Sequence, residues 1–282
     1  MIPAHKMHIS HEQFFGLSSS NGRADFLHKK TIRIFARNVP SCLACATNII
    51  RGFSDDWPYT RRILQVWSVE NMLVAIIDTG IQPGIFPIGP IVYDLEVTTL
   101  GIVRKRRGKI HSFHGAFVAA ILEKYAPGCQ ICSIKIFDDE TQTTTCKMLC
   151  AALRWSRHKD IPIINVSAGS IETKDFKSIQ RAIDALTKKG HTVIAAYNKN
   201  GLPTMPAGHE AVIGVRTNQS LRDGEYIFDH TAIKQDYIAS SQHQLCFLSG
   251  NTLITPMSTS FAVPTITAAL IKKEIENKRK RE

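Results

Sequence analysis

From about residue 60 onward, short apolar runs of strand length alternate with segments whose apolar residues recur every three or four positions. The run Leu73 to Ile77 has the length of a buried strand, whereas Phe176 to Leu186 has helical spacing. Near-continuous apolar strands that alternate with helices are typical of a parallel sheet covered on both faces. We therefore predict an α/β domain whose functional groups lie outside the carboxyl ends of its strands.

The same patterns predict further elements and a division of the chain. Residues 1–45 lack regular patterning and are interpreted as an irregular N-terminal arm, and residues 46–282 as one domain with a basic C-terminal tail. Besides the two segments above, strands are expected at Ser133 to Phe137, Ile161 to Val166, Val193 to Ala196 and Ala211 to Val215, and helices at His114 to Lys124, around Met148 to Leu153 and from Ser260 to about Asn277.

Composition excludes several classes of protein. With 44% hydrophobic and 21% charged residues, the 282-residue chain is ordinary for a globular domain. The net charge of +11 is concentrated in the run Arg104 to Lys109 and in the stretch Lys272 to Glu282, and neither contains aromatic residues for base stacking. Solvated surfaces are therefore favoured over nucleic-acid binding. No apolar run approaches the roughly 18 residues that a membrane span needs.

Seven cysteines, an odd number, without a visible secretory signal favour free thiols, a reducing compartment and a cytoplasmic protein. Two CxxC pairs, Cys42/Cys45 and Cys129/Cys132, have spacings that could bind zinc. For the second pair we favour core or loop thiols, because side chains three apart on a strand point to opposite faces. The first pair stays undecided. A polar terminus is favoured over a metal site for the histidines His5, His8 and His11.

Three residues stand at predicted strand ends or helix starts and carry groups that acyl transfer requires. Asp78 ends the strand that begins at Leu73, where a carboxylate can orient an imidazole. His114 opens a helix, where it is placed for proton transfer. Ser260 opens another, preceding Pro264 in the first turn, where free backbone amides can stabilise an oxyanion. Singly, each has a commoner explanation: a turn aspartate, a packing histidine and a serine N-cap.

Two further segments follow predicted strands. Asn198 follows the strand VIAA, and its side-chain amide can donate a hydrogen bond to a developing oxyanion. Ser167, Ala168 and Gly169 follow the strand IINV, and such small residues leave room for an extended peptide to pair with the backbone. A loop asparagine and an ordinary turn are the respective alternatives.

The order of these groups along the chain is Asp, His, oxyanion donor, Ser, which is the order found in subtilisin. The motifs that carry the likeness are DTG at Asp78, HGAFVAAIL at His114, INVSAGS around Ser167, VIAAYNKNG around Asn198 and STSFAVP around Ser260. Over about residues 65 to 272, the chain resembles the subtilisin-like serine proteases (subtilases, peptidase family S8).

This resemblance implies a subtilisin-like three-layer α/β fold, with a mostly parallel sheet and helices on both faces. It implies Asp78, His114 and Ser260 as a catalytic triad, Asn198 as oxyanion donor, and the segment from Ser167 through Ala168 to Gly169 as the substrate-binding strand. No cofactor is expected. Calcium sites are common in the family, but no ligand cluster is assigned in this sequence.

Three positions depart from the family pattern: Ser258 and Tyr197 replace glycines, and Ala116 replaces a threonine. None removes a catalytic group, but side chains at tight positions reshape a cleft. The leading hypothesis is a serine endopeptidase, with a maturation protease for one dedicated peptide as a narrower version. The alternative is a weak or inactive homologue that binds peptides without cleaving them. The predicted partner is a peptide or protein substrate, and the oligomeric state is left open.

Overall fold

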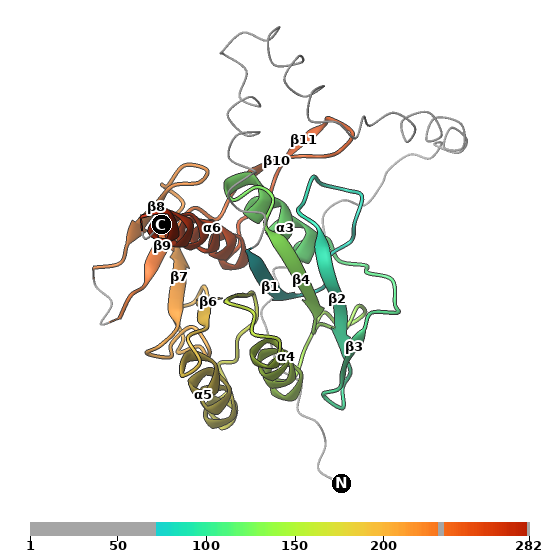
Figure 1. Cartoon of the computed structure of the whole chain (residues 1–282), viewed down its shortest axis with the longest axis vertical. Helices are drawn as coiled ribbons and strands as arrows, with labels where there is room; N and C mark the ends of the chain where they lie inside the picture. Colours follow the sequence, from blue (N-terminus) through green and yellow to red (C-terminus); the bar gives the residue numbers. More distant parts are fainter. Residues whose placement is uncertain (1–71, 231–233, 281–282) are drawn as a thin grey trace, which may run out of the picture. The chain divides into compact units, whose positions relative to one another are not determined.

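The computed structural model describes residues 72–230 and 234–280, which belong to one compact unit (Figure 1). The predicted arm and its boundary near residue 45 lie outside the described residues. So do the Cys42/Cys45 pair and the histidines His5, His8 and His11.

A nine-stranded sheet forms the middle layer, and a two-stranded sheet lies apart from it (Figure 1). The strands are β1 Leu73–Asp78, β2 Ile91–Val97, β3 Val103–Lys105, β4 Gln130–Lys135, β5 Ile163–Val166, β6 Thr192–Ala196, β7 Ile213–Thr217, β8 Tyr226–Phe228, β9 Tyr237–Ala239, β10 Gln244–Cys246 and β11 Thr252–Ile254. The large sheet has the order β3-β2-β4-β1-β5-β6-β7-β9-β8. Its pairs are parallel except β2–β3 and β8–β9 at the two edges.

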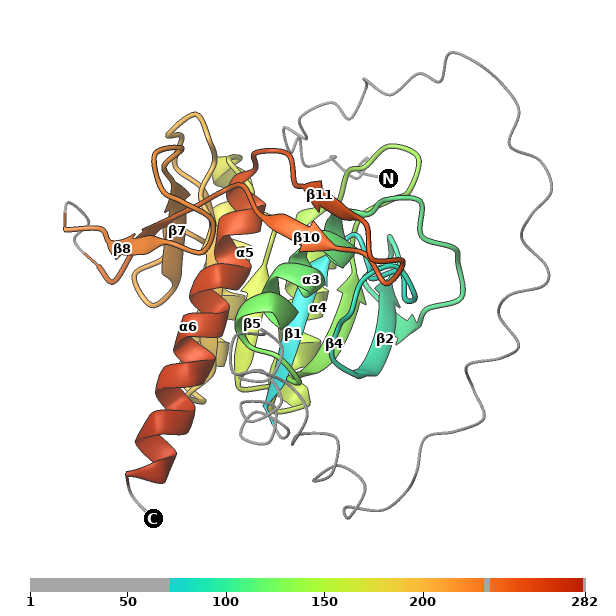
Figure 2. The same cartoon turned by 90° about the horizontal axis from the view of Figure 1, so that it is seen from above.

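Helices cover both faces of this sheet, as the sequence predicts. They are α3 His114–Tyr125, α4 Cys146–His158, α5 Thr173–Thr187 and α6 Thr259–Arg279. The pair α3 and α6 packs together on one face, and α4 and α5 pack together on the other (Figures 1 and 2).

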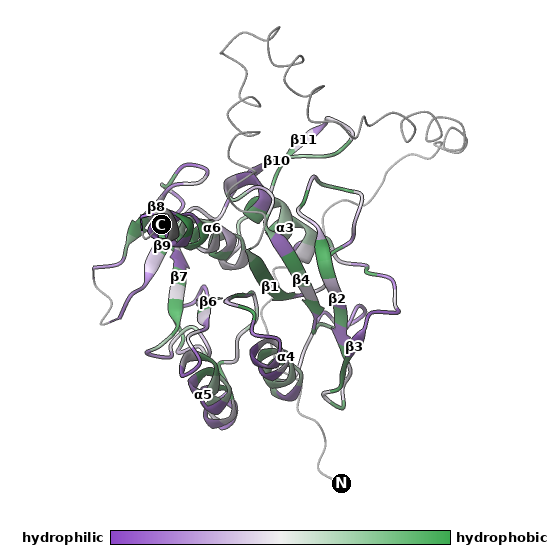
Figure 3. Cartoon of the chain, in the orientation of Figure 1, coloured by the Kyte–Doolittle hydropathy of each residue, from purple (hydrophilic) through white to green (hydrophobic). Residues whose placement is uncertain are grey.

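The central strand β1 shows why two cores form. Its side chains alternate between faces, so Val74 and Ile76 join the core under α3 and α6, whereas Ala75 and Ile77 join the core under α4 and α5. All four are essentially buried. Burial on both faces explains the continuous apolar run in the sequence. The outer helices, by contrast, carry both hydrophobic and hydrophilic residues (Figure 3).

The structure corrects two expectations. The basic run is not simply a solvated loop, because Arg104 and Lys105 lie in β3 and Arg106 forms a two-pronged ion pair with Asp94 at 2.6 and 2.8 Å. Pro264 is the sixth residue of α6 rather than part of its first turn. Because proline has no amide hydrogen, the carbonyl of Ser260 lacks its usual partner four residues along the helix.

Cys129 and Cys132 are buried free thiols, with Cys132 in β4, which confirms the interpretation as core or loop thiols. Burial raises the pKa of each thiol to about 12, so both stay protonated at neutral pH. Among the described helices, none is both long and apolar enough to cross a membrane.

Candidate active site

Three neighbouring strands, β1, β5 and β6, bring most of the predicted site residues to one edge of the sheet. Asp78 is the last residue of β1, Ser167 directly follows β5, and Asn198 lies two residues beyond β6. The three strands are parallel, so their carboxyl ends meet at this edge. The helices α3 and α6 begin with His114 and with Thr259 followed by Ser260.

Asp78 and His114 form the best-defined contact of the site. The Nδ1 atom of His114 lies 2.8 Å and 3.0 Å from the two carboxylate oxygens of Asp78. The carboxylate is fully buried, and His114 is 8% exposed. Because a carboxylate accepts hydrogen bonds, Nδ1 carries the hydrogen, which leaves Nε2 as the basic nitrogen of the neutral ring.

The environment of Asp78 keeps its carboxylate ionised. Burial alone would raise the pKa of this carboxyl group, but the charge of His114 and its hydrogen bond outweigh burial and lower the pKa. The Ser167 side chain and the Thr79 amide, which lies 2.6 Å from Oδ1, lower it further. Because this pKa is depressed, the pair's contribution to stability is present above the ordinary Asp value and is lost only as the pH falls through the lowered value.

A tight contact between β1 and α3 fixes this pair. The Gly115 amide donates a hydrogen bond to Thr79 Oγ1 at 3.0 Å. A Cβ added to Gly115 would lie 2.2 Å from the carbonyl oxygen of Gly80, which is too close for any side chain. Glycine after the histidine therefore permits the helix to start against the DTG turn.

The residue that follows Ser260 packs against this pair. The ring of Phe261 stacks on His114 with 4.8 Å between ring centroids, and its edge meets Phe117 of α3 at 5.8 Å. Phe261 is buried, whereas Ser260 is partly exposed at the surface of the site. The first turn of α6 is thereby packed against α3, and Ser260 lies in this turn.

The amide of Ser260 is not free, which corrects the expectation from the sequence. It donates a hydrogen bond to the hydroxyl oxygen of Ser258 at 3.3 Å, and the Phe261 amide donates to the Ser258 carbonyl at 3.1 Å. Ser258 thus caps α6 in the manner of an N-cap serine. A glycine here would leave the Ser260 amide without that partner.

The predicted substrate strand has small, largely buried residues, with Ser167 and Ala168 buried and Gly169 partly so. The segment is bonded to other parts of the chain at both of its ends. The Ser167 amide donates a hydrogen bond to the Ile77 carbonyl at 3.2 Å, and Ser170 exchanges two backbone hydrogen bonds with Met205 at 2.7 and 2.9 Å. Within the described part of the chain, no hydrogen-bond partner is found for the backbone of Ala168 between them.

Thr204 was not predicted and links two parts of the site. Its hydroxyl accepts a hydrogen bond from the Asn198 amide at 3.2 Å. Its Cγ2 methyl would lie 2.7 Å from a Cβ added to Gly169. Thr204 therefore fills the space between the Asn198 turn and the Ser167–Gly169 segment. No sequence motif marks it, because this contact depends on where the loop after β6 returns.

Asn198 is held in a turn of its own. Its Oδ1 accepts a hydrogen bond from the Asn200 amide at 2.8 Å, so the NH₂ end of the side chain points away from that amide. The preceding Tyr197 points elsewhere. Its hydroxyl donates to Asp236 at 2.8 Å, and the Arg216 guanidinium lies 3.9 Å from the centre of its ring.

The bulk of Tyr197 is accommodated by a neighbouring glycine. A Cβ added to Gly214 of β7 would lie 2.2 Å from the ring of Tyr197. The large residue in place of the family's glycine is therefore matched by a small one on the adjacent strand. Sequence inspection identified Tyr197 as a departure but could not find this compensation, which crosses between strands.

Within residues 72–230 and 234–280, no three His, Cys, Asp or Glu side chains gather as a metal site would require.

Comparison with solved structures finds proteases of the same architecture. The prenylagaramide maturation protease PagA matches with a TM-score of 0.59 and 21% identity over 79% of this chain and 82% of that one. The described part of this chain has a subtilisin-like fold. The self-cleaved protease domain of PatA matches with a TM-score of 0.56 and 23% identity over 75% of this chain and 82% of that one.

A third match is the epidermin leader peptide processing serine protease EpiP from Staphylococcus aureus. Its TM-score is 0.53 at 16% identity, over 78% of this chain and 71% of that one. No protein-family model matches the sequence, and no curated protein does. At such identities the likeness establishes the subtilisin-like fold, and the activity must be argued from the site itself.

Proposed function

We propose that this protein is a serine endopeptidase that hydrolyses peptide bonds. The observation that carries the proposal is the buried Asp78–His114 pair, with the His114 ring stacked on the residue next to Ser260. A carboxylate that orients an imidazole beside a serine at a helix start is the arrangement that activates a hydroxyl for acyl transfer.

In the proposed mechanism, Ser260 attacks the scissile carbonyl while His114 Nε2 takes its proton. Asp78 holds the ring and stabilises the imidazolium that forms. His114 then delivers the proton to the leaving amine, and water hydrolyses the acyl-enzyme by the same sequence of steps. Asn198 and the Ser260 amide donate hydrogen bonds to the tetrahedral oxyanion, which requires the amide to leave Ser258.

We further propose that the substrate lies extended along Ser167, Ala168 and Gly169, and that it is a dedicated peptide that the enzyme matures. The first point is supported by the small residues of that segment and by the unpaired Ala168 backbone. The second is supported by solved proteins with the same fold, among them the maturation protease PagA and the leader peptide processing protease EpiP.

Labelling with a fluorophosphonate probe tests the activity, because the probe reacts with a serine that a base and an oxyanion hole activate. We expect the native protein to be labelled and Ser260→Ala not to be. Ser249→Ala, on the exposed turn between β10 and β11, is the matched control and should be labelled normally. Absence of labelling in the folded native protein would overturn the proposal and leave a peptide-binding homologue.

Substrate range is tested separately, by mass spectrometry of a peptide library after digestion. A dedicated maturation protease should cut a small set of related sequences. Cleavage throughout the library would contradict the dedicated-peptide proposal while leaving the endopeptidase proposal intact.

A further inference from the structure

His243 is a fully buried histidine that the proposed mechanism does not use. It lies between β9 and β10, and its backbone is fixed by two hydrogen bonds to Thr255. The His243 amide donates to Thr255 Oγ1 at 2.9 Å, and the Thr255 amide donates to the His243 carbonyl at 2.8 Å. These two bonds fix the backbone that carries the ring.

Both nitrogens of this ring face hydrogen-bond acceptors. Nδ1 lies 2.7 Å from Oδ1 of Asp223, and Nε2 lies 3.0 Å from the carbonyl oxygen of Phe261. An ionised carboxylate and a carbonyl can only accept hydrogen bonds, so each nitrogen must carry a hydrogen. The geometry thus selects the doubly protonated, positively charged imidazolium.

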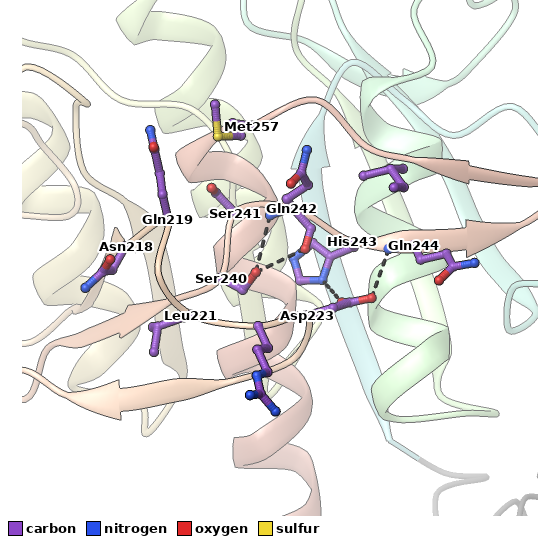
Figure 4. Close-up of a pocket in the computed structure, with 12 residues that line it drawn as sticks. Asn218, Gln219, Leu221, Asp223, Ser240, Ser241, Gln242, His243, Gln244 and Met257 are labelled. Atoms are coloured by element: carbon purple, nitrogen blue, oxygen red, sulfur yellow. Dashed lines mark hydrogen bonds and ion pairs between the residues drawn. The ribbon is translucent and has the colours of Figure 1, made fainter.

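The groups around Asp223 keep it a carboxylate that can hold this charge. Lys124 Nζ and the Tyr125 hydroxyl, both from α3, donate hydrogen bonds to it. The Gln244 amide donates another at 2.9 Å (Figure 4). Burial raises the pKa of Asp223, but the hydrogen bonds from His243, Lys124 and Tyr125 outweigh it and lower the pKa. The Tyr125 hydroxyl also lies 3.4 Å from His243 Nδ1.

The other contact of His243 reaches the proposed reaction centre. Phe261 follows Ser260 directly, and its ring stacks on His114. A hydrogen bond to its carbonyl therefore holds the turn that carries the serine. That turn needs outside support, because Pro264 cannot donate to the Ser260 carbonyl.

We propose that protonated His243 is a positioning residue, which couples the charge of Asp223 to the placement of Ser260 against His114. The proposal rests on the proposed function. Loss of the proton from His243 would remove one of its two donors, release Phe261 and lower the reactivity of Ser260.

The pair is accessible to protons from solvent. A cavity of about 260 Å³ is lined by Asp223 and His243 together with Arg222, Ser241 and Met257, among others (Figure 4). The side chain of Asp223 is 32% exposed, whereas that of His243 is buried. The titratable groups that face the ring or line this cavity are thus Asp223, Tyr125, Lys124 and Arg222.

The test measures the rate at which Ser260 reacts with a fluorophosphonate as a function of pH, in native protein and in Asp223→Asn. In the native protein, a neutral His243 would keep its hydrogen on Nδ1, facing the Asp223 carboxylate, and would lose the one on Nε2. The native rate should therefore fall roughly ten- to a hundredfold at high pH, the factor expected for losing a hydrogen bond from a charged group. In Asp223→Asn, the asparagine amide can donate to Nδ1, so a neutral ring keeps Nε2–H for the Phe261 carbonyl. The ratio of variant to native rate should therefore rise as the pH rises.

Two further variants separate positioning from stability. His243→Leu removes the donor to the Phe261 carbonyl and should lose reactivity at every pH. His191→Leu is the control, since His191 is also buried and bonds a carbonyl, that of Ile161 at 2.8 Å, but precedes β6 at the opposite edge of the sheet. It should lower the melting temperature without a pH-dependent change in rate. A pH-independent ratio for Asp223→Asn would overturn the positioning role.

The charge state can be read without any activity, by ¹⁵N NMR of the histidine rings in Ser260→Ala, with His243→Gln in that background for assignment. We expect His243 to carry two N–H hydrogens at pH 7. A neutral ring would overturn the proposal even if the enzyme is active. A native protein that does not react at all would overturn the proposed function, and the positioning role with it, whatever the NMR shows.

Discussion

The proposed acid–base half of the site and its nucleophile half are built differently. Asp78 and His114 end a central strand and begin a helix, and a buried 2.8 Å contact joins them. Ser260 lies in the first turn of α6 and Asn198 in the turn after β6, and both residues are partly exposed. The departures from the family pattern lie close by, since Ser258 precedes Ser260 by two residues and Tyr197 directly precedes Asn198. The proposed base is therefore held by a buried contact, whereas the proposed oxyanion site is surrounded by partly exposed residues that include both departures.

The two departures themselves differ in kind. The ring of Tyr197 packs over Gly214 and beside the Arg216 guanidinium, and its hydroxyl bonds Asp236. Ser258 instead bonds the very amide that the oxyanion would need. We therefore expect the first to affect stability and the second to affect catalysis, and the following experiments separate these effects.

The largest effect is expected in the acid–base half. His114→Ala should lower kcat by about 10⁶, and Asp78→Asn by about 10⁴, because the asparagine favours the wrong tautomer of the ring. Steady-state kinetics on a cleaved peptide measures both. Equal losses for the two variants would mean that Asp78 does more than orient His114, and a loss of only a few fold would contradict the triad.

The next largest loss of kcat is expected for Asn198→Ala. Removing one oxyanion donor costs roughly 10²–10³ in kcat with little change in KM, since the donor acts on the transition state. Asn198→Asp is the control, because aspartate keeps the oxygen that accepts the Asn200 amide and lacks the NH₂ donor. It should lose kcat as Asn198→Ala does, and full activity of Asn198→Asp would show that turn geometry, rather than the side-chain donor, matters.

The acid–base half was also the more predictable one from sequence. The apolar run before Asp78 and the helical pattern after His114 fix where each side chain lies, because strand ends and helix starts position residues locally. Tyr197 could be recognised as unusual, but its partner Gly214 lies on another strand. Asp223 and Tyr125, which meet at His243, are 98 residues apart and have no shared motif.

Several short strands, among them β8, β10 and β11, were not predicted, and the reason is again physical. β8 has three exposed residues, Tyr226, Ile227 and Phe228, and β10 and β11 are equally short. Short edge strands bury too little surface to impose a continuous apolar pattern, so only their pairing reveals them. The parallel strands β1 and β4 to β7 were predicted, because burial does impose such a pattern. The seven-residue strand β2, which is parallel to β4 but only partly buried, was missed as well.

Specificity offers a second way to test the nucleophile half. Thr204 lies between Asn198 and Gly169, so the proposed peptide along Ser167–Gly169, with its carbonyl at Asn198, would place the side chain of the cleaved residue near Thr204. We expect small residues there. Thr204→Ser removes the methyl group and keeps the hydroxyl, so it should improve kcat/KM for leucine relative to alanine by roughly tenfold. An unchanged ratio would place the specificity pocket elsewhere.

A smaller effect of opposite sign is expected at Ser258. Ser258→Ala frees the Ser260 amide for the oxyanion and should raise kcat about two- to tenfold, the factor for one neutral hydrogen bond. Losing the N-cap should lower the free energy of unfolding by about 1 kcal/mol. Ser258→Thr keeps the hydroxyl and is the control. A fall in kcat for the alanine variant would instead mean that the hydroxyl itself donates to the oxyanion.

The smallest effect is expected from Tyr197→Phe, which removes the hydroxyl and leaves the ring against Arg216. The Asp236 carboxylate loses one donor but keeps the Gly214 amide at 2.8 Å, so the free energy of unfolding should fall by about 1 kcal/mol. Denaturation with urea measures this, with the exposed Tyr226→Phe as control. Activity should be unchanged, because the ring points away from Asn198. A loss of kcat at full stability would show that Tyr197 positions the oxyanion donor, and the contrast between the two departures would then fail.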